Sequence, residues 1–307
     1  MIINAGNITS LYTAFSGAFN VGFMAAPSQW QKIAMRVPSS TRSETYAWLA
    51  AIPRIREWLG ERIVNNLAVR GYAISNRKFE NTVSVGRTEI EDDQYGVYSP
   101  VMQQMGSDAA LHPDTLIFSL LAAGLSTLCF DGQNFFDVDH PVGLNGAPAS
   151  ASNLQAGGNG PLWFLLDCSK PIKPMIFQDR MPFNFTALNK ETDENVFWRD
   201  EYVYGVRARC NVGYGLWQLA YASNMPLNGD TYAAARAAMQ SLVADNGRPL
   251  GVSPTHLIVP PSLDRDARRL LVSGLTAQTV GGVTVAATNE WAASAELLMT
   301  PYLIPGA

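Results

Sequence analysis

Apolar residues recur at helical spacing over one long central segment of the chain. The first stripe consists of Tyr95, Tyr98, Met102, Met105 and Ala109. From 114 to 128, apolar side chains cover more than one face, which is typical of a helix packed on several sides. Pro113 joins the two stretches, and its missing N–H should bend the axis there. The pattern therefore predicts a long, bent spine helix over residues 94–128.

Residues 61–92 change to a period of two, which is typical of strands with one apolar face. The apolar positions are Tyr72, Ile74, Phe79, Val83 and Val85, with polar residues between most of them. An isolated two-stranded hairpin is only marginally stable in water. We therefore expect a hairpin-like ribbon that needs another surface for its apolar side.

The first thirty residues combine Gly, Ala, Ser and Asn with scattered aromatic side chains. The spacing of Phe15 and Phe19 permits a short helix, but Gly17 and Gly22 weaken it. The segment predicts an arm whose aromatic residues, Phe23 among them, dock on another surface. A short membrane-surface helix is the alternative, although such helices usually have Lys or Arg on the polar face, and none is present here.

The remaining chain alternates short strands and helices around a glycine-rich segment. Residues 141–161 are rich in Gly, Pro, Ala, Ser and Asn and predict a flexible loop. Helices are predicted at 43–59, 231–245 and 262–271. Strands are predicted at 162–167, 173–178, 196–204, 206–214, 256–259, 283–287 and 297–303. This order indicates an α+β protein.

Composition narrows the possible functions of these 307 residues. A net charge of −4 argues against bulk electrostatic binding of nucleic acid, which requires basic stripes. Three widely spaced cysteines favour free thiols over a disulfide framework or a zinc site. The first basic residue is Lys32, and no apolar run reaches the roughly 18 residues of a membrane span. We expect neither a secretory signal nor a membrane partner.

One cluster of polar side chains follows the spine segment. Asp131, Asp137, Asp139 and His140 could hold a divalent metal or perform acid–base chemistry. In the structural alternative, Asp131 starts a turn, the two other carboxylates face water and His140 bonds locally. The chain has no nucleophile elbow, Walker A or dinucleotide-binding motif. We therefore favour the structural interpretation and expect no catalytic residue, cofactor or metal.

Two segments resemble the major head subunits of Mu-like phages and prophages. They are YAISNRKFENTVSVGRTEIEDDQYGVY (72–98) and, after an HPD motif, CFDGQNFFDVDHPVG (129–143). A looser similarity continues through THLIVPPSLDRDARRLL (255–271). The resemblance implies the α+β, Hong Kong 97-like phage capsid fold.

That fold implies a division of this chain into five parts. They are an N-terminal arm with a first helix (1–60), an extended E-loop (61–93), a peripheral domain with the spine helix (94–145), an axial domain (146–285) and a closing strand of the peripheral domain (286–307). The flexible loop 141–161 would lie at the start of the axial domain.

The resemblance implies a structural protein, the major capsid subunit of a tailed double-stranded DNA phage. Such a subunit assembles with itself, as hexamers and pentamers, into an icosahedral head in the bacterial host cytoplasm and ends in the virion. The implied partners are a separate scaffold protein, a portal, a decoration protein as an optional addition, and DNA packaged without sequence-specific binding. An encapsulin-type compartment shell and a metal-dependent enzyme using residues 131–140 are the alternatives.

Shell subunits grip different patches on their neighbours, so apolar and charged side chains on the arm and ribbon are the expected contacts. On the arm these are Phe15, Phe19 and Phe23. On the ribbon the apolar candidates are Phe79, Val83, Val85 and Ile90. Arg77, Lys78 and Arg87 are expected to meet carboxylates across a seam, with roughly 0 to 1 kcal/mol for each exposed pair.

Overall fold

The long spine helix of the sequence pattern is present in a computed structural model that describes residues 3–50, 71–92, 94–144, 147–243, 248–280 and 283–303. It consists of the 3₁₀ turn η2 (Gln94–Tyr98), helix α4 (Ser99–Ala122) with Pro113 inside it, and the 3₁₀ turn η3 (Ala123–Leu125). Buried residues lie on several faces of α4, as predicted.

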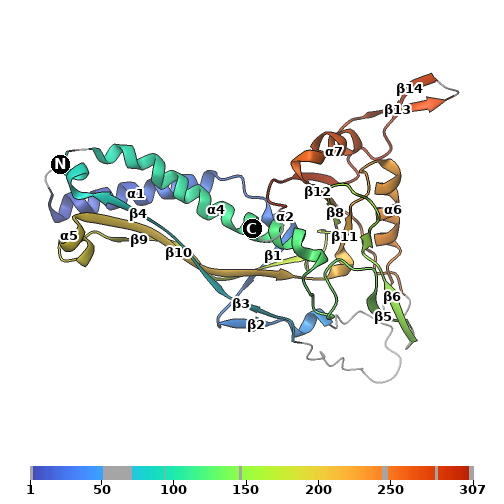
Figure 1. Cartoon of the computed structure of the whole chain (residues 1–307), viewed down its shortest axis with the longest axis horizontal. Coiled ribbons are helices and arrows are strands. Elements are labelled where there is room, and N and C mark those ends of the chain that lie inside the picture. The colour runs from blue at the N-terminus through green and yellow to red at the C-terminus, as the bar shows by residue number, and fades with distance from the viewer. Residues whose placement is uncertain are drawn as a thin grey trace.

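A second long helix, α1 (Ala5–Ala25), lies beside α4 (Figure 1). A Cβ atom added at Gly22 would lie 1.9 Å from the Gln103 backbone oxygen, and one at Gly106 would lie 2.0 Å from the Phe19 oxygen. The short helix that the spacing permits is in fact 21 residues long, and Phe15 and Phe19 dock on the chain's own core. Glycine lowers helix propensity, but here it lets the two helices approach closely while Phe15 and Phe19 pack against the sheet.

The two helices cover one face of a four-stranded sheet of order β1-β9-β10-β4 (Figure 1). Strands β9 (Met175–Leu188) and β10 (Glu201–Tyr214) form a long antiparallel hairpin, which helix α5 (Glu194–Arg199) connects. Strand β1 (Ala34–Pro38) follows the short helix α2 (Trp30–Ile33) and runs parallel to β9. Together these elements form an elongated body (Figure 1).

Strand β4 (Arg77–Gly86) pairs with β10 along its whole length. For residues 77–86 this corrects the expectation of an outlying ribbon, because β10 of the same chain provides the surface that this strand needs. The short strand β3 (Ala73–Ser75) pairs with β2 (Ser43–Thr45), and the 3₁₀ turn η1 (Ala47–Ala50) follows β2. The predicted helix 43–59 thus begins as a strand, and its remainder, like 61–70, lies outside the described residues.

A second body holds a five-stranded sheet of order β15-β12-β8-β11-β7. The strands are β7 (Leu154–Gln155), β8 (Trp163–Leu166), β11 (Ala220–Ser223), β12 (His256–Val259) and β15 (Glu296–Met299). Helices α6 (Gly229–Gln240) and α7 (Asp264–Leu271) pack on it, with the 3₁₀ turns η4 (Trp217–Leu219) and η5 (Pro261–Leu263) at its ends. The predicted strands at 162–167 and 256–259 are confirmed.

The expected axial and peripheral parts do not follow the sheets. Strands β9 and β10, expected in the axial part 146–285, lie in the elongated body under α4 (Figure 1). The closing strand β15 pairs with β12 in the second body. Only the residues after it return to the spine, where the Ser119 hydroxyl donates to the Tyr302 carbonyl at 3.5 Å.

Two hairpins complete the second body. Strands β5 (His140–Leu144) and β6 (Ala147–Ala151) pair antiparallel, so the loop expected at 141–161 is partly a hairpin. The small residues of this segment are compatible with strand pairing as well as with a loop. Strands β13 (Leu275–Val280) and β14 (Val283–Thr288) form a hairpin that projects from the second body (Figure 1). No helix among the described residues is long and apolar enough to cross a membrane.

Candidate assembly surfaces and the buried polar cluster

The end of the β9–β10 hairpin is closed by α5 and its flanking backbone. Asp200 ends the helix in the left-handed conformation with φ of 55°, and its N–H donates to the Val196 oxygen. Asp tolerates this conformation better than most residues. The Asn195 side-chain amide donates to Leu188 O at 3.0 Å and to Glu201 O at 2.7 Å. These bonds tie the two strand ends together and fix the direction of α5.

Within α5, Val196 points inward and the next two side chains point into solvent. Phe197 is 74% exposed and Trp198 is 77% exposed, and their rings meet edge to face at 5.0 Å. Leu188, at the end of β9, is also exposed. Two large aromatic side chains left open side by side typically mark a protein contact.

This aromatic pair was missed in the sequence, where 196–204 was predicted as one strand. The available signal was a Phe-Trp pair between charged residues, flanked by two strand patterns without a turn motif. It differs from the alternation of a strand with one dry face.

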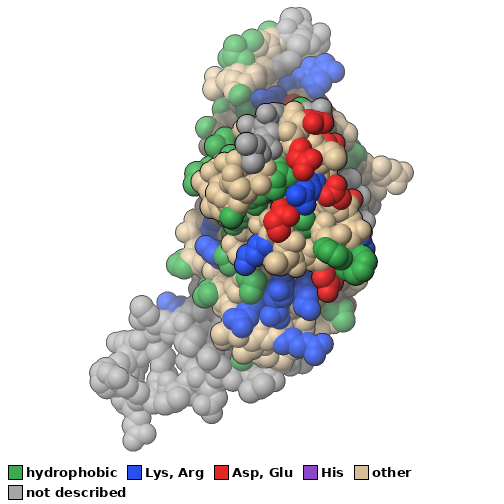
Figure 2. All heavy atoms as spheres, turned by 90° about the vertical axis from the view of Figure 1, so that its left-hand side faces the viewer, with side chains coloured by type: hydrophobic (Ala, Val, Ile, Leu, Met, Phe, Trp, Pro, Cys, Tyr) green, Lys and Arg blue, Asp and Glu red, His purple; other side chains and the backbone are tan. Residues whose placement is uncertain are grey.

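Charged residues surround the aromatic pair at this end of the molecule. We define the acidic tip as residues 87–92 and 189–201. Eight acidic and three basic side chains give it five net negative charges. Figure 2 shows acidic side chains gathered on this end and Lys and Arg side chains gathered below them.

The two segments of the tip are joined by Arg87, which lies at the start of helix α3 (Arg87–Glu91). Its guanidinium lies 3.1 Å from both Glu91 and Glu191, and 3.9 Å from Asp200. The hydrogen bond that Arg87 donates to Glu91 raises the pKa of Arg87. Arg87 was expected to reach a neighbouring subunit, but in the structure carboxylates of its own chain engage it.

The basic residues below the tip lie on the open face of the four-stranded sheet, opposite α1 and α4. In the register of β4 and β10, Lys78 lies directly opposite Arg209, and Glu80 lies directly opposite Arg207. Among the described residues, no ion pair within 4.0 Å involves Lys78, Arg207 or Arg209. We call these three residues the basic sheet face.

The apolar contact candidates divide into covered and open side chains. Four of them are buried in the core between α1, α4 and the sheet: Phe15, Phe19, Val85 and Ile90. Their prediction as contacts between subunits is corrected, because their own chain covers them. The Tyr204 ring, for example, meets the Phe15 ring edge to face at 5.0 Å.

The other apolar candidates remain partly exposed to solvent. Phe23 is 39% exposed, and Phe79 and Val83 are half-buried. The Phe79 ring packs against His112 at 4.2 Å, and the Arg77 guanidinium lies 5.4 Å from the centre of the Phe79 ring. Of the three charged candidates, Arg77 and Lys78 are exposed and form no ion pair within 4.0 Å among the described residues.

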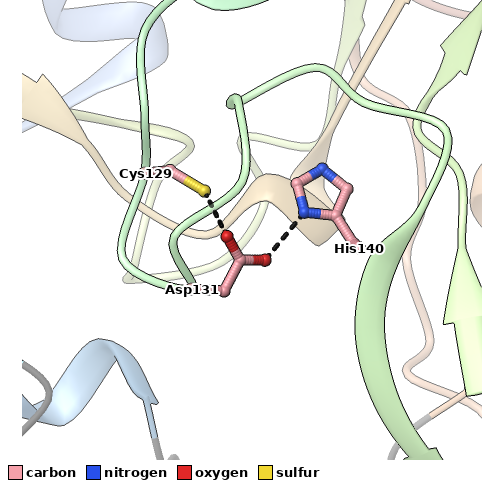
Figure 3. Close-up of side chains that lie close together, drawn as sticks. All are labelled: Cys129, Asp131 and His140. Atoms are coloured by element: carbon pink, nitrogen blue, oxygen red, sulfur yellow. Dashed lines mark hydrogen bonds and ion pairs between the residues drawn. The ribbon is translucent and has the colours of Figure 1, made fainter. Parts of the chain in front are cut away.

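The polar cluster after the spine is a buried hydrogen-bonded network (Figure 3). Asp131 Oδ1 lies 3.0 Å from Cys129 Sγ, and Asp131 Oδ2 lies 2.7 Å from His140 Nδ1. The second ring nitrogen of His140 lies 3.2 Å from Asn153 Oδ1, and the imidazole stacks on Trp217 at 4.0 Å. The carboxylates of Asp137 and Asp139 lie outside this network, and Asp137 joins it only through its backbone N–H, which donates to Asn153 Oδ1 at 2.9 Å.

The network favours a carboxylate at its centre. Burial by itself would raise the pKa of Asp131, but hydrogen bonds from His140, Cys129 and the Gln133 N–H outweigh burial and lower it. Burial raises the pKa of the Cys129 thiol, so that side chain stays protonated. A neutral thiol is neither a nucleophile nor a strong metal ligand. The three groups lie close enough to suit a metal ion, yet each already has a partner, and the geometry fits a structural clamp.

Replacing Asp131 by alanine is expected to destabilise the fold by about 3 kcal/mol, because it leaves the buried imidazole and thiol without their acceptor. The lowered pKa means that this contribution is present above the ordinary carboxyl pKa of about 4 and disappears as pH falls through the lowered value. Denaturant unfolding of the two proteins between pH 7 and pH 3 measures both effects. Asp139→Ala, at an exposed carboxylate, is the control and should change stability by less than about 0.5 kcal/mol.

An equal loss from both substitutions, or a loss independent of pH, would contradict the clamp.

Comparisons with known proteins agree with the fold and with a structural role. A family model described as Mu-like prophage major head subunit gpT matches residues 8–303. The chain is 41% identical to the major capsid protein of Escherichia phage Mu, covering 99% of this chain and 100% of that protein. It is also 41% identical to the Mu-like prophage FluMu major head subunit of Haemophilus influenzae, covering 92% and 93% of the two chains.

Solved structures give the same result. The procapsid of bacteriophage JBD30 matches with a TM-score of 0.84 and 44% identity, covering 98% of this chain and 100% of that one. The JBD30 capsid matches with a TM-score of 0.75 and 32% identity, covering 99% and 100%. The α+β capsid fold is thereby confirmed, and neither the compartment shell nor the metal enzyme is favoured. This chain belongs to the family of Mu-like prophage major head subunits, which are structural capsid proteins and not enzymes.

Proposed function

We propose that this chain builds the icosahedral head of a tailed phage by assembling with copies of itself into hexamers and pentamers. The observation that supports this most directly is the pair Phe197 and Trp198, left open at the end of the elongated body. A chain that buries Phe15, Phe19 and its other large core aromatics has no folding reason to leave this pair in water. A neighbouring copy would bury it.

The tip suits a contact between subunits because it is rigid. Arg87 and its three carboxylates, together with the Asn195 amide, hold α5 on the ends of two paired strands. A preorganised contact loses little entropy on binding. We place the centre of the self-contact at Phe197 and Trp198, and additional contacts at the partly open candidates Phe23, Arg77, Lys78, Phe79 and Val83.

The further partners follow from the family. We propose a separate scaffold protein during assembly, a portal at one vertex and double-stranded DNA packaged without sequence reading. The net charge of −4 supports only weak contact with that DNA. A related capsid, that of bacteriophage JBD30, is decorated with minor capsid protein trimers, which supports a decoration protein here as well. Assembly would take place in the host cytoplasm and the product would be the virion.

The direct test is sedimentation and electron microscopy of the purified full-length chain under assembly conditions, with and without added scaffold. Closed particles of uniform diameter are expected. A small soluble species under all of these conditions would contradict the proposed function. The nucleic-acid or protein content of particles from infected cells would separate a phage head from a compartment shell.

A further inference from the structure

We propose that the acidic tip of one copy seats on the basic sheet face of a second copy, with Phe197 and Trp198 at the centre of the contact. This inference rests on the proposed function and names the two surfaces that self-assembly joins. It concerns residues 87–92 and 189–201 on one side, and Lys78, Arg207 and Arg209 on the other.

The basic sheet face lacks an anionic partner in its own chain. Lys78 and Arg209 are like charges placed directly opposite each other, an arrangement that weakens a strand pair unless a counter-charge is supplied. Arg209 Nε is buried and has no hydrogen-bond partner among the described residues. Glu80, opposite Arg207, accepts a hydrogen bond from the Thr82 hydroxyl. It forms no ion pair within 4.0 Å among the described residues. The face therefore presents cations that an acceptor from outside would satisfy.

The face is also free of covering elements. Helices α1 and α4 pack on the opposite face of the sheet, and no described helix or strand covers the β4–β10 side that bears Lys78 and Arg207 (Figure 1). Met181, the β9 neighbour of Arg209, is 39% exposed. The open face thus combines an exposed apolar side chain with three cations.

The acidic tip is complementary to this face in charge and in apolar surface. Its net charge of five negative units faces a cluster of three cations and one carboxylate. An aromatic pair inside a charged rim is the usual anatomy of a protein interface. Trp and Phe rings also attract guanidinium groups, and Arg207 and Arg209 supply them.

The tip does not reach this face within one molecule. Both lie on the same hairpin, with α5 at its end and Arg207 and Arg209 further along β10, and no ion pair within 4.0 Å joins them among the described residues (Figure 1). A contact between two different patches is heterologous, and repeated around an axis it closes into rings. This geometry is the one that a shell requires.

Packaged nucleic acid is the other anion that three cations would attract. Phosphates would account for Lys78, Arg207 and Arg209, but they give no role to the acidic tip or its aromatic pair. The two explanations differ in what charge reversal does to assembly in the absence of DNA.

The test is a charge reversal with its compensation, R207E/R209E alone and together with E194K/E201K on the tip. Glu194 and Glu201 have no ion pair within 4.0 Å among the described residues, so the tip keeps its internal contacts. We expect R207E/R209E to lower the yield of particles by about 100-fold, because like charges would replace the charge pairs across the interface. The fourfold variant should recover at least a tenth of the wild-type yield. R207K/R209K, which keeps the charge, should assemble.

Each outcome decides the proposal. Thermal unfolding first shows that the unassembled variant is folded; if R207E/R209E is not, the neutral R207Q/R209Q takes its place and should lower the yield by at least tenfold. Normal particle yield from R207E/R209E would overturn the contact, and reduced DNA retention in those particles would assign the face to nucleic acid. Loss without recovery in the fourfold variant would overturn the tip as its partner. If the wild-type chain itself forms no particles, the proposed function fails instead.

Discussion

A chain with Phe197→Ser and Trp198→Ser is expected to stay folded and to form no closed particles. Both side chains are about three-quarters exposed, so their removal takes little from the core of the single chain. In a contact between subunits both rings would be fully buried. Truncating a central aromatic residue of an interface typically costs about 2 kcal/mol or more of binding free energy. Every subunit repeats the loss, so assembly should fall below detection by velocity sedimentation and electron microscopy.

The matched control is Met24→Ser, at an apolar side chain of α1 that is 83% exposed. It removes exposed apolar surface without touching the tip, and the protein should assemble normally. Particles from the doubly substituted chain at wild-type yield would contradict the assignment of the contact to α5. A denaturation midpoint lowered by several degrees would show instead that the aromatic pair supports the fold.

Adding one methyl group at Gly106 is expected to destabilise the protein by about 3 kcal/mol. The new Cβ atom would lie 2.0 Å from the Phe19 oxygen, which belongs to the backbone of α1 and cannot move aside like a side chain. The two helices must separate, and the aromatic residues between α1 and the sheet lose contacts. Denaturant unfolding of Gly106→Ala measures the effect.

The same substitution at Gly17 is the matched control. This glycine is also in α1, and nothing lies within 4 Å of its added Cβ atom. Alanine has the higher helix propensity, so Gly17→Ala should stabilise the protein by about 0.5 to 1 kcal/mol. Equal effects of the two substitutions would contradict the close packing of α1 on α4.

The elements with strong local signals were predictable from the sequence. The spine helix α4 shows a sustained helical period with a proline bend, and β8 and β12 are short apolar runs with clear ends. Helix α1 was not predictable in this way. Its glycines lower helix propensity, and the gain that outweighs this loss comes from packing against α4, far away in sequence.

The contact surface could be predicted only in part for a related reason. Alternation identifies the apolar side of a strand, but it does not say which molecule covers that side. Val85 and Ile90 were correctly read as needing cover, and the chain itself provides it through α1, α4 and β10. Phe197 and Trp198 lie in a six-residue helix, which is too short for a periodic signal.

A cryo-electron microscopy reconstruction of the assembled particle tests whether copies of this chain form a closed shell in which the tip of each copy is buried against a neighbour. The reconstruction should show Phe197 and Trp198 enclosed by a second copy, with carboxylates of the tip within ion-pair distance of Arg207 or Arg209. A closed particle in which both aromatic side chains face solvent would contradict the account.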